Sequence, residues 1–351
     1  MTAPRLEVDL TAIEHNARSL VEPLAAHGIR VTGVCKAALA STDVAEAMVR
    51  GGVSGLGDSR VENLARLRAA GTVERLTLIR SPMLSQAAAV VRHADASLNS
   101  EPLVLDALSA AAHDQDVTHD VVLMVELGDL REGVAADDLV DLARSVARRP
   151  GLRLAGIGTN LACQCGVAPT QQKMDELTRL ALQVEAICGP LSIVSGGNSA
   201  NLDWALDAPD VGRVDELRLG EAILLGTEPL HRRVLNGLRT DAFTLVAEVI
   251  ESREKPAQPW GSIAQTAFGD PQPRPGTGTI RQLILALGRQ DTDPDGLTPP
   301  VGITVLGMSS DHLVLDAGDH KVVVGEELRF QLNYSALVRA TTSPFVTQRP
   351  A

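Results

Sequence analysis

The sequence predicts an α/β protein: a (β/α)8 barrel of the TIM type followed by a C-terminal, mostly-β domain. From about residue 30 to residue 220, short β-rich runs alternate with longer amphipathic stretches, which is typical of parallel β-α-β units. After Gly237, strand-like runs follow one another without helical stretches between them. The 351 residues are enough for a barrel and a smaller domain. We expect the barrel at residues 1–235 and the β domain at residues 236–351, with residues 1–10 as a candidate strand of the β domain.

Eight runs are predicted to be the barrel strands, about the number that a closed barrel needs. They are Val31–Cys35, Ser54–Gly57, Leu76–Ile79, Ala96–Leu98, Val121–Val125, Leu154–Gly158, Ile193–Ser195 and Val214–Arg218. Between them, apolar residues recur at helical spacing, so these stretches can cover the outside of the barrel. The predicted helices are Thr42–Arg50, Arg60–Ala70, Leu84–His93, Glu101–His113, Ala136–Ala147 and Pro169–Ile187. In the β domain we expect strands at Phe243–Ile250, Ile280–Ala286, Val301–Leu306, His312–Asp316 and Lys321–Val324.

The charge and the hydropathy pattern exclude several classes of function. The formal net charge is −12, whereas nucleic acids and anionic membranes favour clustered Lys and Arg. The chain has no apolar run long enough to cross a bilayer, and residues 1–10 lack the apolar centre of a secretory signal. We therefore expect a cytoplasmic protein that binds neither nucleic acid nor membrane.

The four cysteines predict neither a disulfide framework nor a metal site. Cys35, Cys163, Cys165 and Cys188 are too few and too scattered to staple a chain of this length. Cys163 and Cys165 form a C-x-C pair, but no second cysteine pair or histidine pair lies at zinc-binding spacing. We expect free thiols near the end of a strand, and no bound metal.

The residues that follow the predicted strands contain the candidate chemistry, because the carboxyl ends of barrel strands form a single rim. Lys36 follows the first strand, and Arg131 lies in the segment after the fifth. The sixth, seventh and eighth strands are followed by Thr159-Asn160, by Ser195-Gly-Gly-Asn-Ser199 and by Arg218-Leu-Gly-Glu-Ala222. One lysine, two arginines and a run of Gly and Ser therefore converge on one mouth.

Lys36 and the glycine run together indicate a cofactor. A lysine at the end of an apolar strand is partly dehydrated, which lowers its pKa and frees a neutral amine for imine formation. The alternative is a rim lysine whose ammonium simply reaches water. The run Gly197-Asn198-Ser199 could bring N–H groups and a hydroxyl to an anion, although a tight turn would use the same glycine. Gly220 favours the anion site, because barrel phosphate sites commonly use the last two such loops. An imine-forming lysine beside a phosphate site indicates pyridoxal phosphate.

Five segments together resemble the alanine-racemase-type (fold type III) pyridoxal-phosphate enzymes. They are Val34-Cys-Lys36, Asp129-Leu-Arg131, Gly197-Asn-Ser199, Arg218-Leu-Gly220 and Asn333-Tyr334. Four more are similar to the ornithine racemase branch: Thr159-Asn-Leu-Ala-Cys163, Leu217-Arg-Leu-Gly-Glu-Ala-Ile-Leu-Leu-Gly226, Gly288-Arg-Gln-Asp-Thr-Asp-Pro-Asp-Gly296 and Ser309-Ser-Asp-His312. The resemblance covers nearly the whole chain and depends on the order and spacing of the segments. It implies pyridoxal 5'-phosphate and an amino-acid racemase that interconverts L and D forms by abstracting the Cα proton, with ornithine or another basic amino acid as substrate.

The same resemblance implies roles for individual residues. Lys36 would be the Schiff-base lysine and one acid-base group. Arg218 would face the pyridine nitrogen, which must then be an unprotonated acceptor, because a guanidinium group can only donate. The phosphate and the rest of the cofactor would contact Asn160, Gly197, Asn198, Ser199, Gly220, the N–H of Glu221, and Tyr334. Arg131 would lie near the ring hydroxyl and the substrate carboxylate, the alternative being a surface pair with Glu132 or Asp129.

The chain departs from the family at the second acid-base group. Alanine racemases use a tyrosine of the partner subunit's β domain on the opposite face of Cα. The aligned segment here is Gly288-Arg-Gln-Asp291, and Tyr334 is the chain's only tyrosine. His312 and Asp291, on predicted loops, are the first candidates to replace it, and Cys163 is the third. The alternatives are a structural His312 and a solvated acidic turn at Asp291. The resemblance also implies a homodimer with shared active sites.

Two other functions remain open at this point. A lyase similar to D-threonine aldolase or D-serine dehydratase would carry a metal-binding His and Cys pair in its β domain, whereas all four cysteines here precede residue 189. A pyridoxal-phosphate carrier would consist of the barrel alone. For a basic substrate, Asp129 or Asp291 could receive the cationic side chain.

Overall fold

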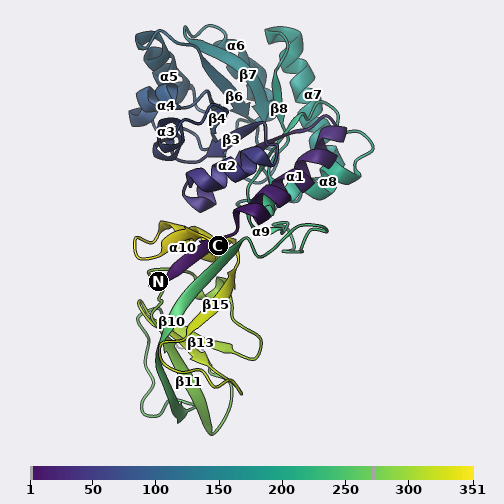
Figure 1. Ribbon diagram of the computed structural model, residues 1–351. Coiled ribbons are helices and arrows are strands. Elements are labelled where there is room, and N and C mark those ends of the chain that lie inside the picture. Colours follow the sequence, from purple (N-terminus) through teal and green to yellow (C-terminus); the bar gives the residue numbers. More distant parts are fainter. Residues whose placement is uncertain (1–2, 271–272) are drawn as a thin grey trace. The chain divides into compact units, whose positions relative to one another are not determined.

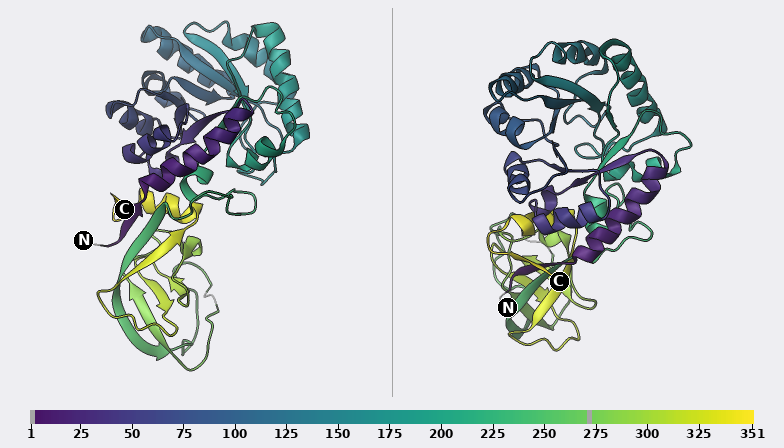
Figure 2. Two further views of the ribbon diagram at one scale, coloured as in Figure 1. Left: turned by 45° about the vertical axis from the view of Figure 1, so that its right-hand side comes forward. Right: turned by 45° about the horizontal axis from the view of Figure 1, so that its top comes forward.

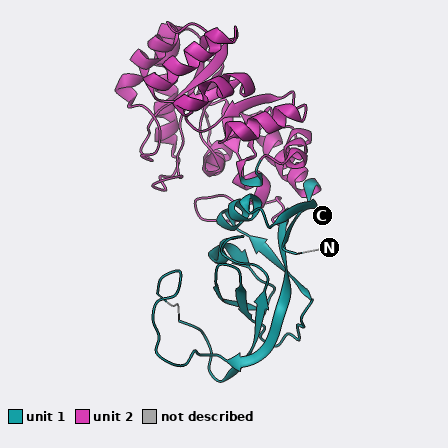
Figure 3. Cartoon of the chain, turned by 90° about the vertical axis from the view of Figure 1, so that its left-hand side faces the viewer, with its two compact units in different colours: residues 1–10, 37–39, 241–351 teal, residues 11–36, 40–240 magenta. Residues whose placement is uncertain are grey.

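The computed structural model describes residues 3–270 and 273–351, and the chain divides into two units (Figure 3). The barrel unit comprises residues 11–36 and 40–240, and the β unit comprises residues 1–10, 37–39 and 241–351. The barrel unit contains a closed barrel of eight parallel strands, and the β unit contains an eight-stranded sheet whose pairings are antiparallel except for one. The predicted fold class is thus confirmed.

The barrel strands are paired in chain order, and the last is paired with the first. They are β2 (Arg30–Val34), β3 (Gly55–Asp58), β4 (Arg75–Leu78), β5 (Ala96–Asn99), β6 (His119–Met124), β7 (Leu152–Gly158), β8 (Ile193–Ser195) and β9 (Glu216–Leu219). Helices lie outside these strands (Figures 1 and 2). The helices are α1 (Leu10–Ala26), α2 (Thr42–Arg50), α3 (Val61–Ala69), α4 (Ala87–His93), α5 (Pro102–Asp114), α6 (Leu139–Val146), α7 (Gln171–Cys188), α8 (Leu202–Asp207) and α9 (Glu221–Leu225). Short 3-10 turns are η1 (Lys36–Ala38), η2 (Leu84–Gln86), η3 (Ala136–Asp138) and η4 (Ser199–Asn201).

Side chains alternate between the barrel interior and the helical layer. Val122 and Met124 of β6 pack in a small cluster with Ile193 of β8, whereas Val121 and Leu123 pack with residues of α5, α6 and α7. Each fully buried aliphatic side chain contributes roughly 1.5–3 kcal/mol. Polar side chains two residues apart on a strand therefore point to the same face, because successive residues of a strand point to opposite faces.

A polar pair marks the inner face of the first and last barrel strands. Thr32 of β2 donates a hydrogen bond to the carboxylate of Glu216 on β9 at 2.6 Å. Lys36 lies four residues after Thr32, and Arg218 lies two residues after Glu216. The period of two therefore brings Lys36 and Arg218 to the same side, at the carboxyl end of the barrel.

The sheet of the β unit is organised around one long strand, β10 (Phe243–Pro256). The strand order is β12-β15-β10-β11-β14-β13, and β1 pairs antiparallel with β10 and parallel with β16. The other elements are β1 (Arg5–Val8), β11 (Thr279–Leu285), η5 (Pro294–Gly296), β12 (Leu297–Thr298), β13 (Thr304–Met308), β14 (Leu313–Asp316), β15 (Glu327–Leu332), α10 (Tyr334–Thr342) and β16 (Thr347–Pro350). Phe243 and Phe330 are fully buried in this unit.

Several predicted elements differ from the structure. The run Lys321–Val324 is a loop, in which the Val323 N–H donates to the Glu326 carboxylate at 3.0 Å, so the predicted strand was wrong. The last barrel strand begins at Glu216 instead of Val214, because the Val214 N–H closes a turn onto the Val211 carbonyl. In the β unit, α10 interrupts the expected succession of strands, and the Asn333 side chain caps it by accepting the Ala336 N–H at 3.0 Å.

Helices α1, α8 and α9 were not predicted, and β14 begins one residue after His312. In the two described ranges, 3–270 and 273–351, no helix has both the length and the apolar character needed to cross a membrane.

Candidate active site

Lys36 is the first residue of η1, and Cys35 alone separates it from the end of β2. Its side chain is partly buried, and it forms no ion pair with any residue that the structure describes. Burial lowers the pKa of its amine, and negative charge on Cys163 opposes that shift. The Arg131 guanidinium lowers the same pKa further, while the carboxylates of Asp58 and Glu132 raise it. The environment therefore favours a neutral amine, which a Schiff-base lysine requires.

Arg218, on β9, is a buried cation with neutral partners. It is 5% exposed, and its guanidinium donates to the Ser195 hydroxyl and, at 2.8 Å, to the Thr159 carbonyl. No carboxylate of the described residues lies within ion-pair distance of it, and burial lowers its pKa. A charge buried without a counter-ion is costly. The position therefore suits an electron-rich ligand atom that would accept from this guanidinium.

Asn160 and Asn198 join the loops that follow β7 and β8. The Asn198 side-chain N–H donates to Asn160 Oδ1 at 3.1 Å, to the Leu161 carbonyl at 2.8 Å and to Cys163 Sγ at 3.5 Å. Asn160 Nδ2 is buried and has no hydrogen-bond partner among the described residues. Such an orphaned donor costs about 1–3 kcal/mol. An acceptor atom of a bound molecule would satisfy it.

The loops after β8 and β9 form a backbone cradle. Gly197 has φ +143°, and a Cβ there would lie 2.1 Å from Asn201 Oδ1, so only glycine fits. Ser199 Oγ accepts the Ala222 N–H at 3.2 Å, which leaves the hydroxyl proton for another acceptor. At Gly220, a Cβ would approach the Val34 side chain at 3.2 Å. Glu221 is the next residue in the chain. Its carboxylate forms an ion pair with Arg232, so its side chain is not part of the cradle.

Arg131 is paired with Glu132, which was one of the two alternative partners expected from the sequence. Nε and Nη2 of its guanidinium donate to the two oxygens of the Glu132 carboxylate, which raises the pKa of Arg131. Because this neighbouring carboxylate balances part of its charge, a substrate carboxylate would have to share the guanidinium with Glu132 or displace it. The structure keeps Arg131 close enough to Lys36 for its charge to act on the Lys36 amine.

Asp129 is an anchor for a loop. It is fully buried, and its carboxylate accepts the backbone N–H groups of four residues of the loop after β7. These donors are Cys163 at 2.9 Å, Gln164 at 2.8 Å, Cys165 at 3.1 Å and Val167 at 3.2 Å. Burial acts to raise the pKa of Asp129, but the four donors together hold it below its ordinary value. With its oxygens occupied in this way, Asp129 is not available to receive a cationic side chain, and that expectation is corrected.

The remaining predicted residues belong to the β unit. Asp291 is 8% exposed, and its carboxylate accepts the Gly288 N–H at 2.9 Å and the Ser343 hydroxyl at 3.0 Å, so it is not a solvated turn. His312 is half-buried, and its Nδ1 lies 2.8 Å from the Asp311 carboxylate. Tyr334 is the first residue of α10.

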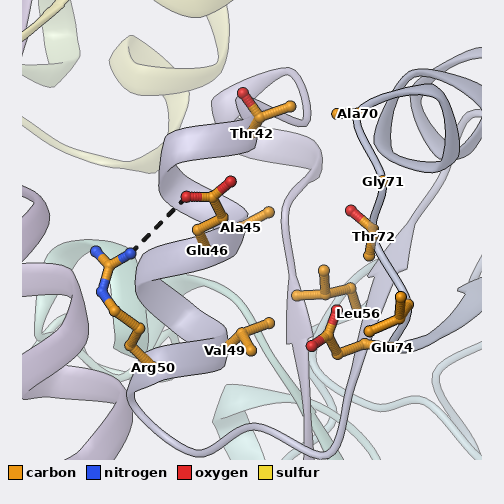
Figure 4. A pocket seen from close by; sticks show the side chains of 11 residues that line it. Thr42, Ala45, Glu46, Val49, Arg50, Leu56, Ala70, Gly71, Thr72 and Glu74 are labelled. Carbon is orange, nitrogen blue, oxygen red and sulfur yellow. Dashed lines mark ion pairs between the residues drawn. The ribbon is translucent and has the colours of Figure 1, made fainter.

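A pocket of about 290 Å³ lies away from these residues, on the outside of the barrel. It is bordered by α2, by Leu56 of β3 and by the segment after α3, and the Glu46–Arg50 ion pair of 3.9 Å lies on its α2 side (Figure 4). None of the predicted site residues lines this pocket. The chemistry of the barrel mouth therefore gives the better candidate site.

Sequence reasoning missed two contributors to the mouth. Ser195 holds Arg218, and the strand alternation could have identified it, because Ser195 ends β8 beside β9. The anchoring role of Asp129 has no sequence signal, because its partners are backbone N–H groups 34 to 38 residues later in the chain.

The chain is similar to known proteins over most of its length. The family model of the alanine racemase N-terminal domain matches residues 8–229. The chain is 38% identical over 350 residues to a lysine racemase of Thermotoga maritima, which covers 99% of this chain and 98% of the relative. It is 34% identical over 349 residues to an ornithine racemase of Acetoanaerobium sticklandii, which covers 98% of each.

Two solved structures show the same fold. An alanine racemase from D-cycloserine-producing Streptomyces lavendulae has a TM-score of 0.79 at 21% identity, with coverage of 100% of this chain and 98% of that chain. A D-threonine aldolase from Filomicrobium marinum has a TM-score of 0.75 at 17% identity, with coverage of 97% and 89%. The fold is therefore shared by enzymes of different reaction classes, and the fold alone does not name the reaction.

Proposed function

The chain belongs to the alanine racemase family, and from that premise we propose that it is a pyridoxal-phosphate-dependent racemase of lysine, ornithine or a similar basic amino acid. One observation carries the proposal: at one barrel mouth lie the partly buried amine of Lys36 and the buried guanidinium of Arg218, and neither forms an ion pair with a residue that the structure describes. The basic substrate is supported by the names of two relatives that align over almost the entire chain.

The residues at the mouth fit the cofactor. The Ser199 hydroxyl and the backbone at Gly197 and Gly220 would hold the phosphate, because glycine lets N–H groups approach an anion closely. Arg218 would donate to the pyridine nitrogen, and the orphaned Asn160 Nδ2 would donate to an acceptor on the cofactor or substrate. When bound, pyridoxal phosphate supplies the electron sink that makes a Cα proton removable.

Other residues position the substrate and move its proton. Lys36 would take the Cα proton on one face, or return it, since burial favours its neutral amine. Arg131 would bind the substrate carboxylate, with Glu132 setting how much of its charge is free. Asn198 would keep Asn160 and Cys163 in place through the hydrogen bonds of its amide.

Several finer points stay predictions from the sequence. Phosphate binding by the Glu221 N–H and by Tyr334, and a second acid-base group at His312 or Asp291, belong among them. So do the homodimer with shared active sites and the cytoplasmic location.

The proposal is tested by recording an absorbance spectrum of the purified protein and then adding single L-amino acids in deuterated water. We expect an absorbance band of the lysine-bound cofactor that disappears in Lys36→Ala, with exchange at Cα and appearance of the D form for lysine or ornithine. A cofactor band without exchange for any amino acid would indicate a carrier or a lyase. The absence of any band would refute the proposal.

A further inference from the structure

Racemisation by two groups needs an acid-base residue on each face of Cα, and this chain lacks a second tyrosine to serve opposite Lys36. The two β-unit candidates already have structural partners. Asp291 is buried and accepts hydrogen bonds from the Gly288 N–H and the Ser343 hydroxyl, and the half-buried His312 is paired with Asp311. A thiol of the barrel unit has the better surroundings.

Cys163 lies in the loop that follows β7, whereas Lys36 follows β2. Around the barrel, β8 and β9 separate these two strands, and Arg218 of β9 lies between them in strand order. A molecule held by Arg218 and Ser199 would therefore be approached by the two side chains from different sides. The Cys163 backbone is fixed by the Asp129 carboxylate, and Asn198 Nδ2 donates to its sulfur at 3.5 Å.

The electrostatic surroundings of Cys163 are cationic. Negative charge on its sulfur raises the pKa of Lys36 and of Arg131, and it acts in the same direction on Arg218. These interactions require the sulfur to lie near all three cations. A cysteine sulfur accepts a proton as the thiolate and releases it as the thiol, so it has the chemistry of an acid-base group. The Asn198 amide that donates to the sulfur also donates to Asn160 Oδ1, and the buried Asn160 Nδ2 has no hydrogen-bond partner in the described part of the chain. An acceptor atom of a ligand would satisfy this donor.

We propose that Cys163 is the second acid-base residue, which exchanges the Cα proton on the face opposite Lys36. In one direction the C–H bond breaks and the proton passes to the thiolate, forming S–H, while Lys36, protonated as the ammonium in this direction, gives one proton to the other face of the same carbon and becomes the neutral amine. The reverse reaction uses the two groups in exchanged roles, so no proton is gained or lost overall. The inference rests on the proposed function and names a residue of the same site.

The test compares Cys163→Ser with Cys165→Ser in the full-length, cofactor-loaded protein. Cys165 is the matched control, because it lies in the same loop, is also exposed, and is held by the same Asp129. With lysine or ornithine in deuterated water, Cys163→Ser is expected to lose inversion by about 100-fold or more. It should still exchange the Cα proton of one enantiomer only, since Lys36 remains, and it should keep the cofactor band. Cys165→Ser should stay within about twofold of the parent.

A second readout does not depend on turnover. Iodoacetamide followed by peptide mass mapping should show that the basic amino acid protects Cys163 from alkylation and leaves Cys165 unprotected. Inversion by Cys163→Ser within about threefold of the parent, or alkylation of Cys163 that the amino acid does not slow, would overturn the inference. If the parent protein itself exchanges no amino acid, the proposed function fails and the inference fails with it. A parent that racemises beside an equally active Cys163→Ser refutes the inference alone.

Discussion

The Asp129 carboxylate accepts the backbone N–H of Cys163 at 2.9 Å, so a residue after β6 fixes the position of a thiol after β7. Three further N–H groups of the same loop donate to this carboxylate. The loop therefore depends on one buried negative charge, and the groups at the mouth depend on the loop. Four variants test how far this and similar buried contacts control activity and stability.

Asp129→Asn replaces one acceptor oxygen by an NH2 group, which is itself a donor and cannot accept the backbone N–H groups that it faces. We expect the free energy of unfolding to fall by about 2–3 kcal/mol, because at least one buried hydrogen bond is lost and its donor is left unsatisfied. The kcat should fall for every amino acid that the enzyme accepts, since the loop position changes. Denaturant unfolding and steady-state kinetics check this, with the exposed Asp137→Asn as control. A rise in KM for basic amino acids alone would instead mean that Asp129 receives their cationic side chain.

Arg218→Lys keeps the charge but cannot span both the Ser195 hydroxyl and the Thr159 carbonyl. Leaving one buried acceptor unsatisfied should lower the free energy of unfolding by about 1–3 kcal/mol and weaken cofactor retention. Arg213→Lys is the control, because Arg213 is paired with the Glu185 carboxylate and is more exposed than Arg218. Thermal unfolding and absorbance after gel filtration measure the two effects. Unchanged retention in Arg218→Lys would mean that the guanidinium does not contact the cofactor.

Gly197→Ala places a methyl group 2.1 Å from Asn201 Oδ1 at a φ of +143°. We expect the turn after β8 to shift and the protein to retain less cofactor. Gly71→Ala is the matched control, because Gly71 also has positive φ (+91°) but no heavy atom within 4 Å of the added Cβ. Equal cofactor retention in the two variants would show that the Gly197 turn is not part of the phosphate cradle.

Buried His119 predicts a component of acid sensitivity. Burial lowers its pKa to about 4, and its Nε2 lies 2.8 Å from the Ser97 hydroxyl. Between the folded pKa and the ordinary value of about 6.5, only the unfolded chain binds the proton, so stability is complete above that window and falls as the pH drops through it. The loss is roughly 2 kcal/mol by about pH 5. His119→Gln should show a smaller fall in Tm between about pH 7.5 and about pH 5, and an equal fall would show that His119 is not the source.

The sequence predicted the parts of this protein that depend on local periodicity. Alternating strand and helix patterns identified the barrel, and the residues after the strands identified Lys36, Ser199 and Arg218. The barrel prediction is confirmed because the hydrophobic period is a property of neighbouring residues, whereas the roles of the three site residues stay predictions. The predicted strand at Lys321–Val324 failed because a β-branched run does not by itself provide a pairing partner.

The tertiary structure alone decided which groups at the mouth are engaged and which are available. In the folded chain, Arg131 is paired with Glu132, and backbone N–H groups occupy the Asp129 carboxylate. Asp291 is buried, and Cys163 lies close enough to Lys36 to influence the pKa of its amine. Arg131 and Glu132 are neighbours in the chain. The other three relations join residues far apart in the chain or depend on burial by such residues. Hydrogen bonding, burial and charge coupling are set by distances in the folded chain, and no sequence period encodes those distances.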